Sequence, residues 1–221
     1  MTKIKICCIS SLEEARLAIE HGAYAIGLVG RMPSGPGPIE DNLIAEIVDS
    51  IPPLMNSFLL TSETEADAII AHHARVKTTA IQIVDAVTSG TYTALRMALP
   101  GIKLVQVIHV RNERAIDEAL AAAEHVDHLL LDSGNPDLRV KELGGTGRTH
   151  DWSISRRIVE QSSVPVFLAG GLNGANVRQA IDRVQPYGVD VCSGVRTNGK
   201  LDQKKLSEFF RSVQGRTTSS S

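Results

Sequence analysis

Short apolar runs alternate with amphipathic segments along almost the whole chain, and this alternation constrains the fold more than any other feature. Eight runs are rich in β-branched residues and predict strands. They are 3–8, 24–29, 56–61, 80–84, 103–110, 127–132, 165–169 and 189–193. Strands that alternate with helices pair in parallel, and eight of them close a barrel. We therefore predict an α/β protein that folds as a single-domain (β/α)8 barrel, the TIM barrel.

The segments between these runs carry apolar residues at helical spacing. Ser11 and Glu14 have the spacing of a capping box, and His21-Gly22 ends the first helix. Seven further helices are predicted at 41–50, 63–75, 89–98, 112–125, 153–161, 175–184 and 202–213. We expect the barrel over 1–214 and a flexible tail over 215–221. An open doubly wound sheet is the alternative, but its first strand normally leads into a Gly-rich turn.

Charge and cysteine content limit the partners of the chain. The 23 Lys and Arg residues against 25 Asp and Glu residues leave a net charge of −2, so we expect neither nucleic acid nor an anionic membrane as a partner. No apolar run approaches the roughly 20 residues that cross a bilayer. Three cysteines, two of them adjacent, predict reduced thiols and a cytoplasmic protein. A homo-oligomer remains open.

Residues at the ends of the predicted strands are the candidates for catalysis, because barrel enzymes react at that face. Lys5 and Cys7 share one side of the first strand, and the ammonium would lower the pKa of the thiol. A buried cysteine that acts only as a small apolar residue is the alternative. Asp132 ends the sixth strand and precedes a long polar loop that includes a Gly-rich stretch over 144–149.

Glycines follow the seventh and eighth predicted strands, at Gly170-Gly171 and at Gly194. Barrels bind phosphate through backbone N–H groups at these two positions. The alternative is that these glycines only form tight turns. Because the chain is slightly acidic overall, such a local site is the means by which it would bind an anionic substrate.

Several of these segments occur together, in the same order, in one family. They are Lys5-Ile6-Cys7, Leu131-Asp132, Gly144-Gly145-Thr146-Gly147-Arg148-Thr149-His150-Asp151-Trp152, Leu168-Ala169-Gly170-Gly171-Leu172-Asn173 and Val189-Asp190-Val191-Cys192-Ser193-Gly194-Val195. In these segments the chain resembles the phosphoribosylanthranilate isomerases of tryptophan biosynthesis, a part of aromatic amino-acid biosynthesis.

The resemblance implies an aldose-ketose isomerase that performs an Amadori rearrangement on a small phosphorylated substrate and uses no cofactor. Cys7 matches the general base of the family, and Asp132 matches the general acid. The residues implied to bind the substrate and its phosphate are Lys5, Gly145, Thr146, Gly170, Gly171, Asp190, Ser193 and Gly194.

The chain departs from the family at the part that recognises anthranilate. Met32 to Ile39 replaces a segment that ends in arginine in the family, so Arg31 is the candidate contact for the anthranilate carboxylate. Cys8 stands where the family usually has Gly, and Val84 follows Gln82-Ile83 where the family has His. A paralogue acting on another sugar amine, a non-catalytic binder and a phosphate-binding aldolase or epimerase are the alternatives.

The histidines do not indicate a metal site. His72-His73 lies in a predicted surface helix, and the others have no recognisable ligand spacing. His109, near the end of the fifth strand, either lines the pocket or is a satisfied strand-end residue.

Overall fold

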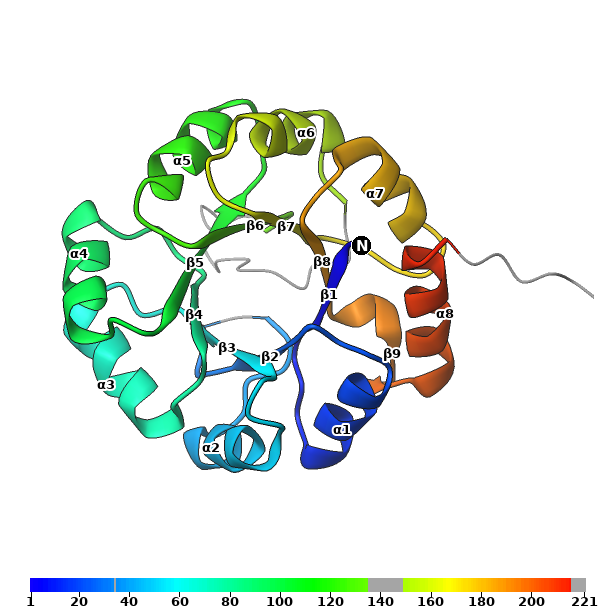
Figure 1. The fold of residues 1–221 in the computed structure, drawn as a ribbon, viewed down its shortest axis with the longest axis horizontal. Helices are drawn as coiled ribbons and strands as arrows, with labels where there is room; N and C mark the ends of the chain where they lie inside the picture. Colours follow the sequence, from blue (N-terminus) through cyan, green and yellow to red (C-terminus); the bar gives the residue numbers. More distant parts are fainter. Residues whose placement is uncertain (34, 135–148, 216–221) are drawn as a thin grey trace, which may run out of the picture.

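The computed structural model describes residues 1–33, 35–134 and 149–215, and its strands form a closed barrel (Figure 1). Within these residues, eight parallel strands follow one another in chain order, and β8 pairs with β1 to close the ring. Their bounds are β1 Lys3–Ile6, β2 Ala25–Val29, β3 Asn56–Thr61, β4 Ala80–Ile83, β5 Lys103–His109, β6 His128–Asp132, β7 Val166–Leu168 and β8 Gly188–Val191. The predicted (β/α)8 barrel is confirmed.

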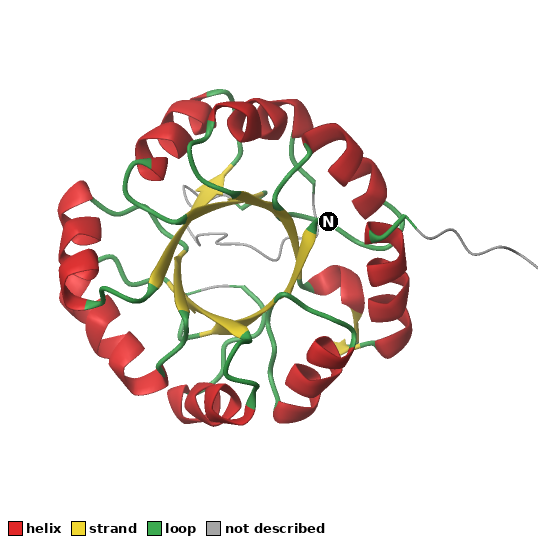
Figure 2. Cartoon of the chain, viewed as in Figure 1, coloured by secondary structure: helices red, strands yellow, loops and turns green. Residues whose placement is uncertain are grey.

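A ring of helices encloses the ring of strands (Figure 2). The α-helices of the described ranges are α1 Leu12–Glu20, α2 Asp41–Ser50, α3 Ala66–Val76, α4 Ser89–Ala98, α5 Arg114–Ala123, α6 Trp152–Gln161, α7 Val177–Val184 and α8 Gln203–Val213. Between β8 and α8 the chain forms a short 3-10 helix, η1 Ser193–Val195, and a hairpin of β9 Arg196–Thr197 and β10 Lys200–Leu201. The sequence does not predict this hairpin, because two-residue strands show no periodicity. Apart from Gly215, the predicted tail lies outside the described residues.

The barrel has an outer and an inner core, because successive side chains of a strand face opposite sides. Ile4 and Ile6 of β1 pack outward among the helices, whereas Phe58 and Phe167 fill the interior. The two phenyl rings meet edge to face at a centroid distance of 6.1 Å. Phe167 is in register with Gly188, the first residue of β8, so these rings close the N-terminal end of the barrel.

The start of α1 follows the capping pattern only in part. The Ser11 hydroxyl accepts a hydrogen bond from the Glu14 backbone N–H at 3.1 Å, as predicted. The Glu14 carboxylate does not return to Ser11, as a capping box requires, but accepts from the Ser10 backbone N–H at 2.9 Å. The reason is a tertiary partner, Arg196, which holds the same carboxylate.

His72 and His73 lie in α3, an outer helix of the barrel as predicted, but both side chains are on its buried face. His72 Nε2 lies 3.0 Å from an Asp41 carboxylate oxygen, and His73 Nε2 lies 2.8 Å from the Thr78 carbonyl oxygen. These contacts make both histidines structural. Across the described residues, no group of three or more His, Cys, Asp or Glu side chains is arranged to hold a metal ion.

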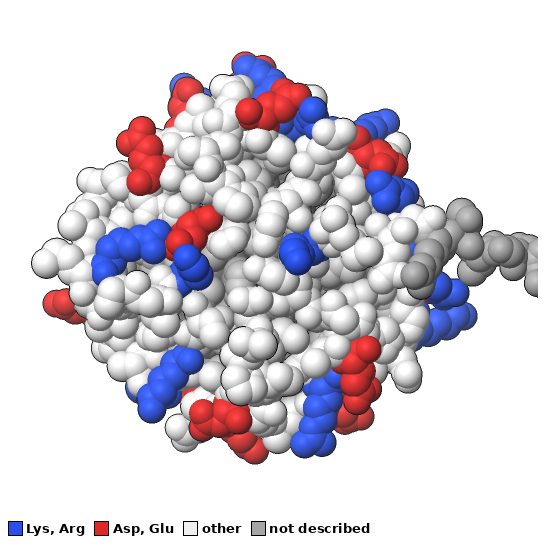
Figure 3. All heavy atoms as spheres, viewed as in Figure 1, with Lys and Arg blue, Asp and Glu red and all other residues white. Residues whose placement is uncertain are grey.

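The surface carries charges of both signs. On the face shown in Figure 3, acidic and basic side chains are interspersed around the edge, without a broad area of one sign. This distribution agrees with the net charge of −2. None of the described helices has the length and apolarity that crossing a membrane requires.

Candidate active site

A pocket opens at the C-terminal ends of the strands, and every strand of the barrel or the segment following it contributes to its lining. The catalytic candidates both line it: Cys7, which directly follows β1, and Asp132, the last residue of β6. Four of the predicted binding residues do so as well: Gly170, Gly171, Asp190 and Ser193. Lys5, Gly194 and Arg31 are not among the lining residues, and Arg31 is exposed. Gly145 and Thr146 lie outside the described residues.

Lys5 lies beneath this pocket rather than in its mouth. Its side chain is fully buried, and its ammonium nitrogen is 2.9 Å from an Asp190 carboxylate oxygen across the β1–β8 seam. Burial alone lowers the pKa of Lys5, but Asp190 and Cys7 outweigh it, so the pKa of the ammonium is raised. A charged ammonium is therefore held beside the Cys7 thiol.

The Cys7 thiol has a different protonation state from the one predicted. Burial raises its pKa to about 11, although the Lys5 ammonium acts in the opposite direction. The prediction of a lowered pKa is therefore wrong. Burial destabilises the thiolate more than the Lys5 ammonium stabilises it, because Asp190 neutralises much of the charge of Lys5. This raised pKa favours the thiol form of Cys7 at neutral pH.

Asp132 ends β6 with a side chain that is 8% exposed. Burial raises the pKa of its carboxyl, and the nearby Asp190 adds to this, while a hydrogen bond from the Ser133 backbone N–H and the charges of His109 and Lys5 oppose it. A carboxyl with a raised pKa keeps its proton closer to neutral pH. Asp132 is thus suited to donate a proton.

Gly27 on β2 makes room for two of these groups, and the sequence analysis did not single it out. A β-carbon placed on Gly27 would lie 2.8 Å from Cys7 Sγ and 3.0 Å from Lys5 Nζ. The signal was present, because a glycine inside a strand otherwise made of Ala, Ile, Leu and Val often marks a close approach.

The loops after β7 and β8 meet at the edge of the pocket. Gly170 and Gly171 have φ angles of +83° and +64°, a region that other residues rarely adopt. A β-carbon at Gly194 would overlap the carbonyl oxygen of Leu172, so the two loops can touch only because residue 194 has no side chain. These glycines therefore do more than form independent turns, since they bring both loops to one edge.

The family model of N-(5'-phosphoribosyl)anthranilate isomerase matches residues 4–212. The chain belongs to this family. N-(5'-phosphoribosyl)anthranilate isomerase 2 of Methanosarcina mazei is 38% identical over 209 residues, which cover 94% of this chain and 92% of the relative.

Solved isomerases of the family have the same fold. The crystal structure of phosphoribosylanthranilate isomerase from Thermotoga maritima has a TM-score of 0.81 at 31% identity and covers 97% of this chain and 100% of its own. A phosphoribosylanthranilate isomerase in complex with reduced 1-(o-carboxyphenylamino)-1-deoxyribulose 5-phosphate has a TM-score of 0.78 at 30% identity. It likewise covers 97% of this chain and 100% of its own.

Most of the pocket lining that comes from β2 to β6 and from the loop after β2 is apolar in this member of the phosphoribosylanthranilate isomerase family. It includes Val29, Met32, Pro36, Leu60, Val107 and Leu130. Gln82 of β4 also lines this part of the pocket, and its Oε1 is buried without a hydrogen-bond partner among the described residues. Among the described lining residues none is Lys, Arg or His. His109 lies outside this lining. Its Nε2 is 3.0 Å from the Val84 carbonyl oxygen, as expected of a strand-end residue, but its Nδ1 is buried without a hydrogen-bond partner among the described residues, so the side chain is only half satisfied.

The expectation that all the cysteines are reduced thiols is wrong for two of them. Cys8 and Cys192 form a disulfide in this phosphoribosylanthranilate isomerase, and both line the pocket. Strand alternation places Cys8 on the outer face of β1, but β1 ends at Ile6 and Cys8 adopts a φ of +60°, which turns its side chain toward β8. Cys7 remains free.

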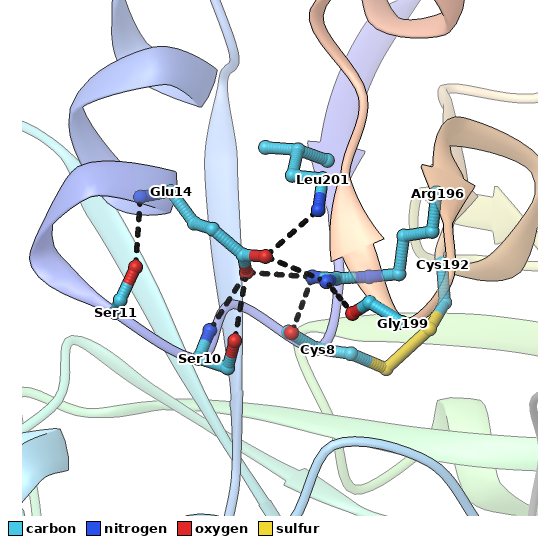
Figure 4. A network of polar contacts seen from close by, with 8 residues as sticks. All are labelled: Cys8, Ser10, Ser11, Glu14, Cys192, Arg196, Gly199 and Leu201. Carbon is cyan, nitrogen blue, oxygen red and sulfur yellow. Dashed lines mark hydrogen bonds and ion pairs between the residues drawn. A yellow bond between two sulfur atoms is a disulfide. The ribbon is translucent and has the colours of Figure 1, made fainter.

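A buried ion pair lies beside this bridge (Figure 4). Arg196 Nη1 is 2.8 Å from one Glu14 carboxylate oxygen, and both side chains are about one-tenth exposed. Arg196 also donates to the carbonyl oxygens of Cys8 and Gly199. The Leu201 backbone N–H donates to Glu14 at 2.8 Å. The network thus fastens the hairpin after β8 to the start of α1.

Proposed function

We propose that this chain catalyses the Amadori rearrangement of N-(5'-phosphoribosyl)anthranilate to 1-(2-carboxyphenylamino)-1-deoxyribulose 5-phosphate, in the tryptophan pathway. The observation that carries the proposal is that Cys7 and Asp132, far apart in the chain, line one pocket whose edge holds the glycines of two loops. A cytoplasmic location and a small phosphorylated substrate, without nucleic acid, membrane or cofactor, belong to the same proposal.

The first step opens the furanose ring. Asp132 donates its proton to the ring oxygen while the bond from C1 to that oxygen breaks, and the amine nitrogen supplies the electron pair that forms the C1–N double bond. The substrate becomes an iminium cation with a free hydroxyl, and Asp132 becomes a carboxylate. The raised pKa of Asp132 supports this role, because the proton must be present before the reaction.

The second step removes the proton at C2. The iminium cation draws electrons from C2 and makes its proton acidic, and the same positive charge favours the thiolate of the neighbouring Cys7. Cys7 takes the proton, and the electron pair forms a C1–C2 double bond, which neutralises the iminium. The resulting enaminol becomes the aminoketose when C1 gains a proton and the C2 hydroxyl loses one.

Lys5 and Asp190 act in this proposal as positioning residues. The Lys5 ammonium lies beside the thiol and is held there by Asp190 at 2.9 Å. Its charge stabilises the thiolate that the second step requires, and Asp190 limits that effect until the substrate cation arrives. The contact with substrate originally expected of Lys5 is thereby replaced by a contact with Cys7.

Phosphate binding is proposed for the edge of the pocket formed by Gly170, Gly171, Ser193 and Gly194. Gly145 and Thr146, outside the described residues, complete this set in the proposal. An anchored phosphate would fix the sugar while its other end reacts. Arg31 remains the proposed contact for the anthranilate carboxylate.

The proposal is tested by turnover. Purified protein should convert phosphoribosylanthranilate, with loss of its anthranilate fluorescence. Cys7→Ala and Asp132→Asn should each lower kcat by about 10²–10⁴-fold, the range of a general acid or base. Asp117→Asn, at an exposed position of α5, is the matched control and should keep the wild-type rate. A wild-type protein without turnover, or both site variants at the wild-type rate, would overturn the proposal.

A further inference from the structure

The disulfide between Cys8 and Cys192 joins the segments that follow the C-terminal ends of β1 and β8, at the pocket. Its α-carbons are 5.9 Å apart, although the residues are separated by 184 positions in the chain. This α-carbon distance lies within the range that a disulfide spans. Cys8 follows β1 and Cys192 follows β8, so the bridge crosses the seam at which the barrel closes (Figure 4).

Each cysteine of the bridge is the chain neighbour of a proposed site residue. Cys8 follows Cys7, the proposed base, and Cys192 precedes Ser193, the first residue of η1 and a proposed phosphate contact. Both sulfur-bearing residues also line the pocket itself. A change in the bridge therefore acts directly on the backbone at the edge of the pocket that is proposed to bind phosphate.

The backbone at Cys8 is held in an unfavourable conformation. Its φ of +60° lies in the left-handed region, where a residue with a β-carbon is strained. Gly37, from the loop after β2, packs so closely that a β-carbon there would lie 2.7 Å from Cys8 Cβ. The disulfide holds this conformation together with the hydrogen bond that Arg196 donates to the Cys8 carbonyl oxygen. Reduction removes one of these restraints and lets the strained segment relax.

The three cysteines differ in how readily an oxidant or reductant reaches them. Cys192 is partly exposed, whereas Cys8 and Cys7 are only 6% and 4% exposed, and burial raises the pKa of Cys7 to about 11. Thiolates, not thiols, carry out disulfide exchange. Exchange therefore begins at the partly exposed Cys192, next to which Cys8 lies, whereas burial disfavours the thiolate of Cys7.

We propose that Cys8 and Cys192 form a reversible redox pair that sets the affinity of the pocket for phosphorylated ligands, high when bridged and lower when reduced. Bridge formation removes one electron and one proton from each thiol. A low-molecular-weight disulfide accepts both electrons and both protons by thiol–disulfide exchange and leaves as two thiols. In a reducing compartment such a bridge is transient rather than structural. The phosphorylated sugar as ligand rests on the proposed function; the redox pair does not.

The experiment compares the protein after dithiothreitol with the protein after oxidised glutathione. Mass spectrometry of alkylated peptides should show Cys8 and Cys192 bridged only in the oxidised sample and Cys7 free in both. The KM for phosphoribosylanthranilate and the dissociation constant for inorganic phosphate should each be about 3–10-fold lower in the bridged form, with kcat within twofold. The melting temperature should also be higher in the bridged form.

Two variants isolate the bridge. Cys192→Ser removes it without changing the strained position, and Cys8→Gly removes it while relieving the left-handed strain. Both should lose every response to the redox treatment. A response that persists in either variant, thiols that stay unbridged in oxidised wild type, or equal phosphate affinity in the two verified states would overturn the inference. A redox-dependent phosphate affinity without turnover would overturn only the proposed function.

Discussion

Glu14 is expected to contribute more to stability than any exposed charge of this protein. Its carboxylate lies 2.8 and 2.9 Å from the two terminal nitrogens of Arg196. It also accepts hydrogen bonds from the backbone N–H groups of Leu201 at 2.8 Å and Ser10 at 2.9 Å. Glu14→Ala removes every one of these acceptors at once. The substitution also leaves the Arg196 guanidinium without a counter-charge, on a side chain that is only 9% exposed.

The size of the effect follows from this burial. Removing one partner of a buried ion pair costs about 3–5 kcal/mol, because the other charge stays buried and uncompensated. Each side chain here keeps about a tenth of its surface in water, so we expect the lower end, a loss of about 3 kcal/mol for Glu14→Ala. Glu14→Gln keeps one acceptor oxygen and should lose about 1.5 kcal/mol.

The assay is urea unfolding at pH 7, followed by circular dichroism, with the free energy of unfolding compared at an unchanged m-value. Glu160→Ala is the matched control, because Glu160 pairs with Arg156 on the surface of α6 and should lose less than about 0.5 kcal/mol. The reasoning is refuted if Glu14→Ala loses less than about 1 kcal/mol, or no more than the control.

Acid should weaken the same network. Burial alone would raise the pKa of Glu14, but the hydrogen bonds from Arg196, Leu201 and Ser10 lower it below its ordinary value. A carboxyl with a lower pKa in the folded state contributes stability above its unfolded pKa, and this contribution is lost as the pH falls through the folded pKa. The acid-dependent loss of stability should therefore be smaller in Glu14→Gln than in the wild type.

Three further predictions concern the site and its surroundings. Gly27→Ala should lower kcat by about 10²-fold, since the added methyl group displaces Cys7 Sγ and Lys5 Nζ. Circular dichroism checks that the variant is folded, and an unchanged kcat would contradict the close approach. In the wild type, kcat/KM should fall as the pH rises through the raised pKa of Asp132, because the proposed acid loses its proton; Asp132→Asn should lack this fall, and a wild-type pH profile in the variant would rule out Asp132 as the acid. Burial lowers the pKa of His150 to about 4, below its ordinary 6.5. The stability that neutral His150 contributes is therefore complete above pH 6.5 and is lost as the pH falls toward 4. The urea midpoints at pH 7 and pH 5 should differ more in the wild type than in His150→Gln.

The order and type of the elements could be predicted from the sequence, because their signals are local. The helices Asp41–Ser50 and Ser89–Ala98 begin and end where the sequence pattern predicts, and the strand Asn56–Thr61 does too. Apolar spacing and capping residues act over a few positions, so they can be read without knowing the fold. The same rules place Cys7 and Asp132 at strand ends, since the period of a strand is set by its backbone.

The pairings across the barrel could not be predicted in this way. Cys8 meets Cys192, and Glu14 meets Arg196, only because β8 returns to β1 and brings distant segments to one seam. The turn of Cys8 away from strand alternation also depends on contacts beyond its own neighbours. No local pattern records these contacts, because closure of the barrel creates them.

The alternation along the chain was sufficient to specify a barrel and the end of it at which the proposed site lies, because backbone geometry and apolar spacing act residue by residue. The protonation of Cys7, the room that Gly27 provides and the bridge at the seam depended on the folded molecule. Desolvation and close packing are properties of the whole surroundings of a group, and those surroundings exist only once all eight strands have closed.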